Sequence, residues 1–182
     1  MPLPGNPTME KDELKLLLNR DQIRRRVKEL AAEISRDYRG REILLICVLK
    51  GAFVFLSDLM RHIDSPVQVD FVGLASYGSE TVSSGQVRVT RESTIPVKGK
   101  DVIIVEDIID TGRTLKFLAH ELRSGRPRSL KICCLLDKKS RREVEFAADY
   151  VGFDIEDLFV VGYGLDVNEQ FRNLPDIRHV AK

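Results

Sequence analysis

The stretch VIIVEDIIDTGRTL, residues 102–115, sets two adjacent acids at the end of an apolar run and follows them with a third acid and a polar turn. The apolar run predicts a buried strand. Burying an unpaired carboxylate costs on the order of several kcal/mol, which normally keeps Asp and Glu out of protein cores. We therefore expect a cation, or a ligand rich in hydroxyl groups, to meet Glu106, Asp107 and Asp110 where the strand ends.

The residues after the acids predict a turn that opens a helix. Leu115, Leu118, Ala119 and Leu122 recur at helical spacing. The first N–H groups of a helix lack backbone partners, and together with threonine hydroxyls and a close-approaching glycine they form a phosphate cradle. Ordinary helix capping by Asp110 or Thr111 is the structural alternative.

Capping does not explain Glu106 and Asp107. Adjacent strand residues point to opposite faces, so these two acids form a metal-chelating pair only if the strand has already ended. At a strand end they can accept hydrogen bonds from sugar hydroxyls, while Mg²⁺ is shared with the phosphates of the ligand. Acids beside a phosphate cradle suggest a ribose phosphate. The chain has neither the glycine-rich dinucleotide fingerprint nor a P-loop.

Further segments with the buried-strand pattern lie at residues 43–49 and 129–137, and residues 67–76 alternate like a strand. A capping-box pair, Asn19 and Gln22, begins a helix that ends near Gly40, and another helix follows Gly51. Strands alternating with helices predict a doubly wound α/β domain with a parallel sheet. Ligands bind such sheets at the carboxyl ends of the strands, here residues 49–51, 106–114 and 137–139.

Bulk composition narrows the class of protein. The 182 residues are 43% hydrophobic, which fits one domain, and a net charge of +1 gives no nucleic-acid signature. The three cysteines lie in apolar runs and predict reduced thiols. No apolar run approaches the roughly 20 residues that span a bilayer, and the first residues do not resemble a signal peptide, so we expect a cytoplasmic protein without membrane contact.

Residues 77–100 are rich in Ser, Thr, Gly and charge. A surface hairpin around Ser84 and Gly85, flanked by alternating Val87 and Val89, is the structural interpretation. A mobile lid beside the binding edge is the functional one. The two interpretations do not exclude each other.

Residues 102–115 resemble the phosphoribosyl-pyrophosphate motif of type I phosphoribosyltransferases, in which paired acids and an Asp-Thr-Gly-x-Thr turn end an apolar strand. Four more segments resemble the hypoxanthine-guanine phosphoribosyltransferases in the same order: VLKGAFVFLSDL (48–59), ASYGS (75–79), LLDKKSRR (135–142) and VGFDIEDLFVVGYGLDVNEQFRNLP (151–175). The resemblance implies one domain over residues 1–182, with a doubly wound parallel-sheet core, a flexible lid at about 77–100 and a small hood mainly from residues 151–182.

The resemblance also implies a reaction. Enzymes of this family transfer a 5-phosphoribosyl group from phosphoribosyl pyrophosphate to N9 of hypoxanthine or guanine, with Mg²⁺, giving IMP or GMP and pyrophosphate. Asp110 matches the catalytic acid that accepts the proton from purine N7. The family is oligomeric, which implies a homodimer or homotetramer.

The remaining roles follow from the same matches. The family residues that bind the ribose and the 5′-phosphate match Glu106, Asp107, Asp110, Thr111, Gly112, Arg113 and Thr114. The pyrophosphate group matches Lys50, Gly51 and Arg172, and relatives carry a cis peptide between the residues equivalent to Leu49 and Lys50. The purine group matches Lys138, which donates to O6, Phe159, which stacks on the base, Val160 and Asp166. Ser76 and Tyr77 match the lid, and Asp166, Glu106 and Asp107 are the candidate Mg²⁺ ligands.

Taken without the resemblance, several of these residues have ordinary explanations. Phe159 would be a core residue, Arg172 a surface charge, and Lys138 part of a solvated basic loop with Arg141 and Arg142. One rival function keeps the fold but binds RNA or DNA through residues 138–142 and 24–26. The near-neutral charge argues against it, so we expect no nucleic-acid partner. Another rival is a transferase that prefers xanthine.

Overall fold

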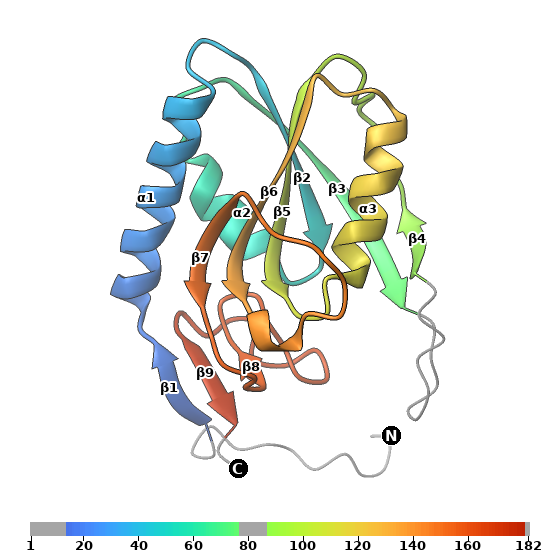
Figure 1. Cartoon of the computed structure of the whole chain (residues 1–182). Coiled ribbons are helices and arrows are strands. Elements are labelled where there is room, and N and C mark those ends of the chain that lie inside the picture. Colours follow the sequence, from blue (N-terminus) through green and yellow to red (C-terminus); the bar gives the residue numbers. More distant parts are fainter. Residues whose placement is uncertain (1–13, 77–86, 181–182) are drawn as a thin grey trace, which may run out of the picture.

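The computed structural model describes residues 14–76 and 87–180. Figure 1 shows a twisted central sheet with helices on both faces and a smaller sheet below it. The central sheet has the strand order β4-β3-β2-β5-β6-β7. Its strands are β2 (Ile43–Leu49), β3 (Val67–Ser76), β4 (Val87–Arg91), β5 (Asp101–Ile109), β6 (Ser129–Asp137) and β7 (Tyr150–Asp154).

All neighbouring strands of the central sheet are parallel except β4, which pairs antiparallel with β3. The carboxyl ends therefore share one edge, at the bottom of the sheet in Figure 1. Ile109 of β5 is in register with Asp137 of β6. The predicted doubly wound parallel sheet is confirmed. Ligands of such sheets are expected at the shared carboxyl edge.

Side-chain alternation along the strands builds two cores. In β2, Ile43, Leu45 and Cys47 face the core with α1 (Arg20–Asp37) and α2 (Phe53–Met60). The intervening β2 residues pack on the other side with α3 (Arg113–Ser124). Because both faces are covered, the strand reads as a continuous apolar run in the sequence.

The predicted capping box is present at the start of α1. Asn19 and Gln22 form the expected capping box at the start of α1: Asn19 Oδ1 accepts from Gln22 N at 2.9 Å, and Gln22 Oε1 accepts from Asn19 N at 2.8 Å.

Within residues 14–76 and 87–180, every helix is too short or too polar to span a lipid bilayer. All three cysteines are buried and unbridged, and burial raises the pKa of Cys47 to about 12.

The smaller sheet lies beyond the carboxyl edge of the central sheet in Figure 1. Its strand order is β1-β9-β8, with β1 (Leu14–Leu18), β9 (Ile177–Val180) and β8 (Val160–Val161) all antiparallel to their neighbours. The range 151–182, expected to form most of the hood, thus includes most of β7, a strand of the central sheet. In turn, β1 joins the small sheet from the other end of the chain.

Only part of the expected lid is described. Ser76 ends β3, whereas Tyr77 and the turn around Ser84 and Gly85 lie outside the described residues. Beyond β4 the chain is tied to the sheet through Asp70, whose carboxylate accepts hydrogen bonds from the backbone N–H groups of residues 94 and 95 at 2.6 and 2.8 Å. These bonds and that of Ser93 hold the pKa of Asp70 at about 2, against the opposing effect of its burial. The last part of the range 77–100 is therefore anchored.

Candidate active site

The turn after β5 leaves the start of α3 without a side-chain cap. Gly112 is the N-cap residue, with a φ of 81° in the left-handed region that favours glycine. Thr111 Oγ1 accepts only a long bond of 3.4 Å from Arg113 N. Asp110 therefore does not cap α3, and the alternative explanation of this residue as an ordinary helix cap is wrong. A hollow of about 160 Å³ lies at this helix start, lined by the turn, Glu106 and Thr114.

Glu106 and Asp107 are 8% and 9% exposed, and both lie within β5, which continues to Ile109. The Glu106 side chain curls back along the strand, so that its Oε1 accepts from Asp107 N at 3.2 Å. Burial raises the pKa of Glu106 well above its usual range, and the neighbouring charge of Asp107 raises it further. The two carboxyls therefore influence each other inside the strand, although alternation predicts opposite faces.

The Asp107 carboxylate packs directly on the backbone of the loop after β2. A Cβ at Gly51 would overlap the Asp107 carboxylate, and a Cβ at Gly164 would overlap the Gly51 carbonyl oxygen. Gly164 also has a φ of 100°. The Asp107 carboxylate, the loop after β2 and the segment at Gly164 thus pack together with no room for a Cβ, and glycine is required at both contacts. The peptide between Leu49 and Lys50, which leads into this loop, is cis.

A network of charged side chains surrounds this loop. Lys50 Nζ donates to Glu169 Oε1 at 2.7 Å, and Arg172 Nη2 donates to Glu169 Oε2 at 3.1 Å. Arg172 Nη2 also lies 2.9 Å from Asp166 Oδ1, and its Nη1 donates to Gly164 O at 2.8 Å. Hydrogen bonds from Lys50 and Arg172 lower the pKa of Glu169. The structure thus brings together Lys50, Gly51, Asp166 and Arg172.

Lys138 and Lys139 differ clearly in how far their side chains are exposed. Lys138 is 8% exposed, and its Nζ lies 3.6 Å from Asp157 Oδ1. The Lys139 side chain is 68% exposed and pairs with Asp154 at 2.8 Å. Only Lys138 is thus held at the carboxyl edge as a buried amine.

Phe159 is 56% exposed, so the interpretation of this residue as core is wrong. Val160, its neighbour, is 6% exposed and begins β8. A large aromatic ring left in solvent beside a buried strand is available to stack on a ligand.

The segment after β6 closes over the acid-rich turn. Arg141 Nε donates to Asp110 Oδ1 at 3.1 Å, and Arg142 Nη1 donates to the Asp110 carbonyl at 2.7 Å. Arg142 also forms an ion pair with Asp137. Each basic residue of 138–142 thus has an acidic partner, which weakens the case for this segment as an RNA-binding face. Arg113 is also paired, with Glu143 at 2.7 Å.

Within residues 14–76 and 87–180, no three His, Cys, Asp or Glu side chains form a group that could hold a metal ion. The carboxylates present suit the oxygen preference of Mg²⁺, which proteins commonly bind through one or two carboxylates together with substrate phosphates. Asp166 fits such a role less simply, because its Oδ2 accepts from Glu169 N at 2.8 Å while Oδ1 faces Arg172.

Sequence reasoning missed three side chains that join the site: Glu169, Arg141 and Asp157. Each becomes significant only through contacts made in the folded chain, such as the bond between residues 50 and 169, which are 119 positions apart. The residues expected at the carboxyl edge nevertheless lie at the ends of β2, β5 and β6 or on the loops that follow these strands, and on the segment from β8 to Arg172.

Comparison with known proteins matches the phosphoribosyl transferase domain to residues 15–168. The hypoxanthine-guanine phosphoribosyltransferase of Bacillus subtilis (strain 168) is 47% identical over 93% of this chain and 94% of its own length. A crystal structure of a hypoxanthine-guanine phosphoribosyltransferase from Bacillus anthracis has a TM-score of 0.88 and 48% identity, and covers 92% of this chain and 98% of that one.

A bifunctional TilS/HprT protein of Listeria monocytogenes serotype 4b (strain F2365) is 44% identical over 95% of this chain, which spans only 27% of that protein's length. The Bacillus subtilis relative and the solved structure each match over more than nine-tenths of both chains. The chain belongs to the hypoxanthine-guanine phosphoribosyltransferase family.

Proposed function

We propose that this protein transfers a 5-phosphoribosyl group from phosphoribosyl pyrophosphate to N9 of hypoxanthine or guanine, releasing pyrophosphate and IMP or GMP. One observation carries the proposal. An uncapped helix start, a pair of buried acids and a buried lysine lie at the carboxyl edge of the central sheet, and the loop after β2 joins them to two clustered cations, Lys50 and Arg172. Each feature suits a different part of the two substrates.

The turn 110–114 is the proposed 5′-phosphate site. The N–H groups at the start of α3, the Thr111 and Thr114 hydroxyls and the backbone of Gly112 and Arg113 would bind the phosphate oxygens. The Arg113 side chain is assigned no role, because it pairs with Glu143.

Glu106 and Asp107 would accept hydrogen bonds from the ribose hydroxyls. Hydroxyl donors would satisfy these buried carboxyls and so reduce the free-energy cost of burying them. Mg²⁺ would be held by carboxylates of the site, with Glu106, Asp107 and Asp166 as candidates, and would neutralise charge on the donor's pyrophosphate. Lys50, Gly51 and Arg172 are the proposed pyrophosphate site, next to those carboxylates.

Asp110 is the proposed general base for the purine N7 proton. Its carboxylate is 44% exposed and paired with Arg141 at 3.1 Å, so it is accessible to a bound base. Lys138 would donate to O6 of a 6-oxopurine. Adenine carries a donor amino group at that position, which would meet the ammonium of Lys138 unfavourably. Phe159 would stack on the base, and the backbone of Val160 would contact its edge.

The test is a product assay. The protein is incubated with Mg²⁺ and phosphoribosyl pyrophosphate, and hypoxanthine, guanine, xanthine and adenine are offered in turn. We expect IMP and GMP, with little or no AMP. Dominant formation of the xanthine nucleotide would favour the xanthine-preferring alternative, and absence of any nucleotide would refute the proposal. We also propose that the protein is cytoplasmic and forms a homodimer or homotetramer, as expected from the family. Light scattering, which measures the mass of the assembly, tests the number of subunits.

A further inference from the structure

Glu169 occupies the point where the two cations of the proposed pyrophosphate site meet. Its Oε1 accepts from Lys50 at 2.7 Å, and its Oε2 accepts from Arg172 at 3.1 Å. One carboxylate therefore offers a separate anionic oxygen to each cation. This is the arrangement that a phosphate group would offer to the same two side chains.

A tight turn places Glu169 there. Asn168 and Glu169 have φ values of 51° and 62°, and Glu169 N donates to Asp166 Oδ2 at 2.8 Å. The Glu169 side chain itself is 63% exposed. Its backbone is therefore fixed by the turn, whereas its carboxylate can leave the cations for water at little cost, as exposed ion pairs are weak.

The two cations depend on Glu169 to different degrees. Arg172 is anchored without it, through Gly164 O at 2.8 Å and Asp166 at 2.9 Å. Its Nε is buried and has no hydrogen-bond partner among the described residues. The Lys50 side chain is 66% exposed, and within residues 14–76 and 87–180 its amine bonds to Glu169. Removing the Glu169 charge would free Lys50 while Arg172 stays in place.

We infer that Glu169 is a positioning residue that holds Lys50 and Arg172 as an internal substitute for pyrophosphate and must release them before pyrophosphate binds. The inference rests on the proposed function, because it assumes that these cations receive pyrophosphate. It extends that function: Glu169 lowers the affinity of the site for pyrophosphate, so the carboxylate favours departure of this product by returning to the cations.

The test measures binding of inorganic pyrophosphate in the presence of Mg²⁺ by calorimetry, without turnover. Glu169→Gln keeps the size of the side chain and removes its charge. We expect its Kd for pyrophosphate to fall by about two- to fivefold, the range set by an exposed ion pair. Glu42→Gln is the matched control, because it removes the same charge at the opposite end of β2, and its Kd should equal that of the wild type.

A third variant separates this inference from the proposed function. Lys50→Met should weaken pyrophosphate binding if the cations are the pyrophosphate site. If Lys50→Met binds as tightly as the wild type, the proposed pyrophosphate site is wrong. If Lys50→Met weakens binding but Glu169→Gln is unchanged or weaker, the inference about Glu169 alone is overturned.

Steady-state kinetics give a second readout that loss of structure would not reproduce. In Glu169→Gln, the KM for phosphoribosyl pyrophosphate should fall while the KM for hypoxanthine stays constant. Glu169→Ala should behave in the same way, and Glu169→Asp should return toward the wild type. A rise in the phosphoribosyl pyrophosphate KM in both the Gln and Ala variants would contradict the inference.

Discussion

Strand β5 buries carboxylates at both of its ends, but their surroundings differ. At the amino edge, Asp101 is fully buried and accepts from Arg128 Nε at 3.0 Å and Ser129 Oγ at 2.6 Å. Its hydrogen bond from Arg128 lowers its pKa, against the effect of burial. At the carboxyl edge of the same strand, Glu106 and Asp107 are also buried, and burial raises the pKa of both.

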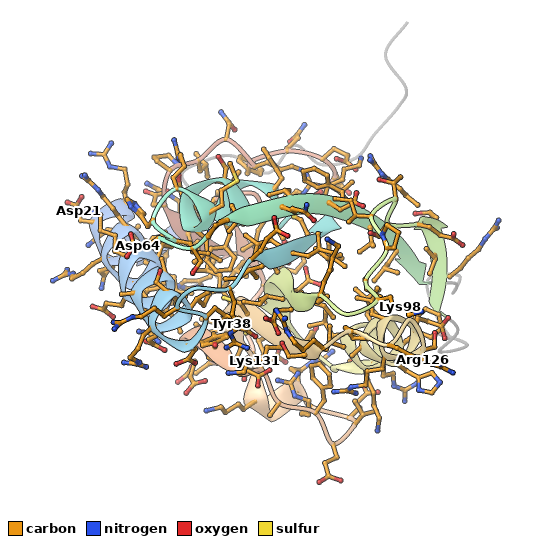
Figure 2. All side chains as sticks on the ribbon, turned by 90° about the horizontal axis from the view of Figure 1, so that it is seen from above. Asp21, Tyr38, Asp64, Lys98, Arg126 and Lys131 are labelled. Carbon is orange, nitrogen blue, oxygen red and sulfur yellow. The ribbon has the colours of Figure 1, made fainter. Side chains whose placement is uncertain are left out.

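A second group of side chains at the amino edge is also paired within the chain. Figure 2, which looks down from this end of the molecule, shows Tyr38 and Lys131 close together. Lys131 Nζ lies 5.7 Å from the Tyr38 ring centroid and 4.9 Å from that of Tyr150, whose hydroxyl donates to Asp37 at 2.8 Å. The difference teaches that Asp101 is balanced by cations of the chain, whereas Glu106 and Asp107 at the carboxyl edge form no ion pair among the described residues and await a ligand.

The largest expected effect separates chemistry from stability. Asp110→Asn should lower kcat by about 10²–10⁴-fold, because the amide cannot accept the purine proton. Its stability should change little, since Asp110 is about half exposed and forms no buried pair. The measurements are kcat with hypoxanthine and calorimetric binding of phosphoribosyl pyrophosphate, which should remain near the wild type. Near-wild-type turnover would remove Asp110 from the reaction.

The amino edge should respond in the opposite way. Asp101→Asn should lower the free energy of unfolding by about 2 kcal/mol, less than a fully buried pair because Arg128 and Arg41 are partly exposed. Its kcat should stay close to that of the wild type. Urea unfolding at pH 7 measures the first quantity.

The pH dependence of this loss sharpens the comparison. The pKa of Asp101 is lower in the folded protein than in the unfolded chain, so its contribution is present above about pH 4 and is lost as the pH falls through that region. The stability difference between wild type and Asp101→Asn should therefore shrink below about pH 4. A difference that is constant from pH 7 to pH 3 would show that the charge of Asp101 is not what stabilises the fold.

Much of this arrangement follows from the sequence, because hydrophobic periodicity is a local property. The continuous apolar runs at β2, β5 and β6 imply strands covered on both faces, and their alternation with helices implies the parallel order and hence the carboxyl edge. Phe159 shows the limit: periodicity favours a core position, whereas the folded chain leaves it 56% exposed.

The parts that could not be predicted depend on contacts distant in sequence. The pairing of β1 with β9 joins opposite ends of the described chain, and nothing in the five residues LKLLL specifies that partner. The packing of Gly51 on Asp107 and the bond between Lys50 and Glu169 likewise require the finished fold. The curled side chain of Glu106 brings it toward Asp107, which simple strand alternation does not allow for.

Two lysines, Lys131 near the start of β6 and Lys138 just after its end, are expected to show a smaller difference between the two edges. Lys138→Ala should lower the preference for hypoxanthine over adenine by about tenfold, the value of one charged hydrogen bond, with little change in donor affinity. Lys131→Ala, at the amino edge, should reduce stability through its lost contacts with Asp37 and Tyr150 and leave base preference unchanged. Competition assays with mixed purines measure the preference. Equal preference in both variants would refute the assignment of Lys138.

The smallest expected effect is a gain in the free energy of unfolding at the carboxyl end of β5. It tests the comparison most directly, because the same kind of change at the amino end should cause a loss. Glu106→Gln should raise the free energy of unfolding at pH 7 by about 1 kcal/mol in the absence of ligand, since a neutral amide needs neither a buried charge nor the uptake of a proton on folding. Asp101→Asn, the same kind of change on the same strand, should lower it.

Ribose 5-phosphate then supplies the functional half of the test. A ligand that binds the folded protein stabilises it in proportion to its affinity. It should therefore stabilise the wild type more than Glu106→Gln, because the amide is a weaker acceptor for sugar hydroxyls than a carboxylate. If Glu106→Gln loses as much stability as Asp101→Asn and responds to the ligand like the wild type, then Glu106 is a structural acid like Asp101, and the two edges of the sheet do not differ as argued.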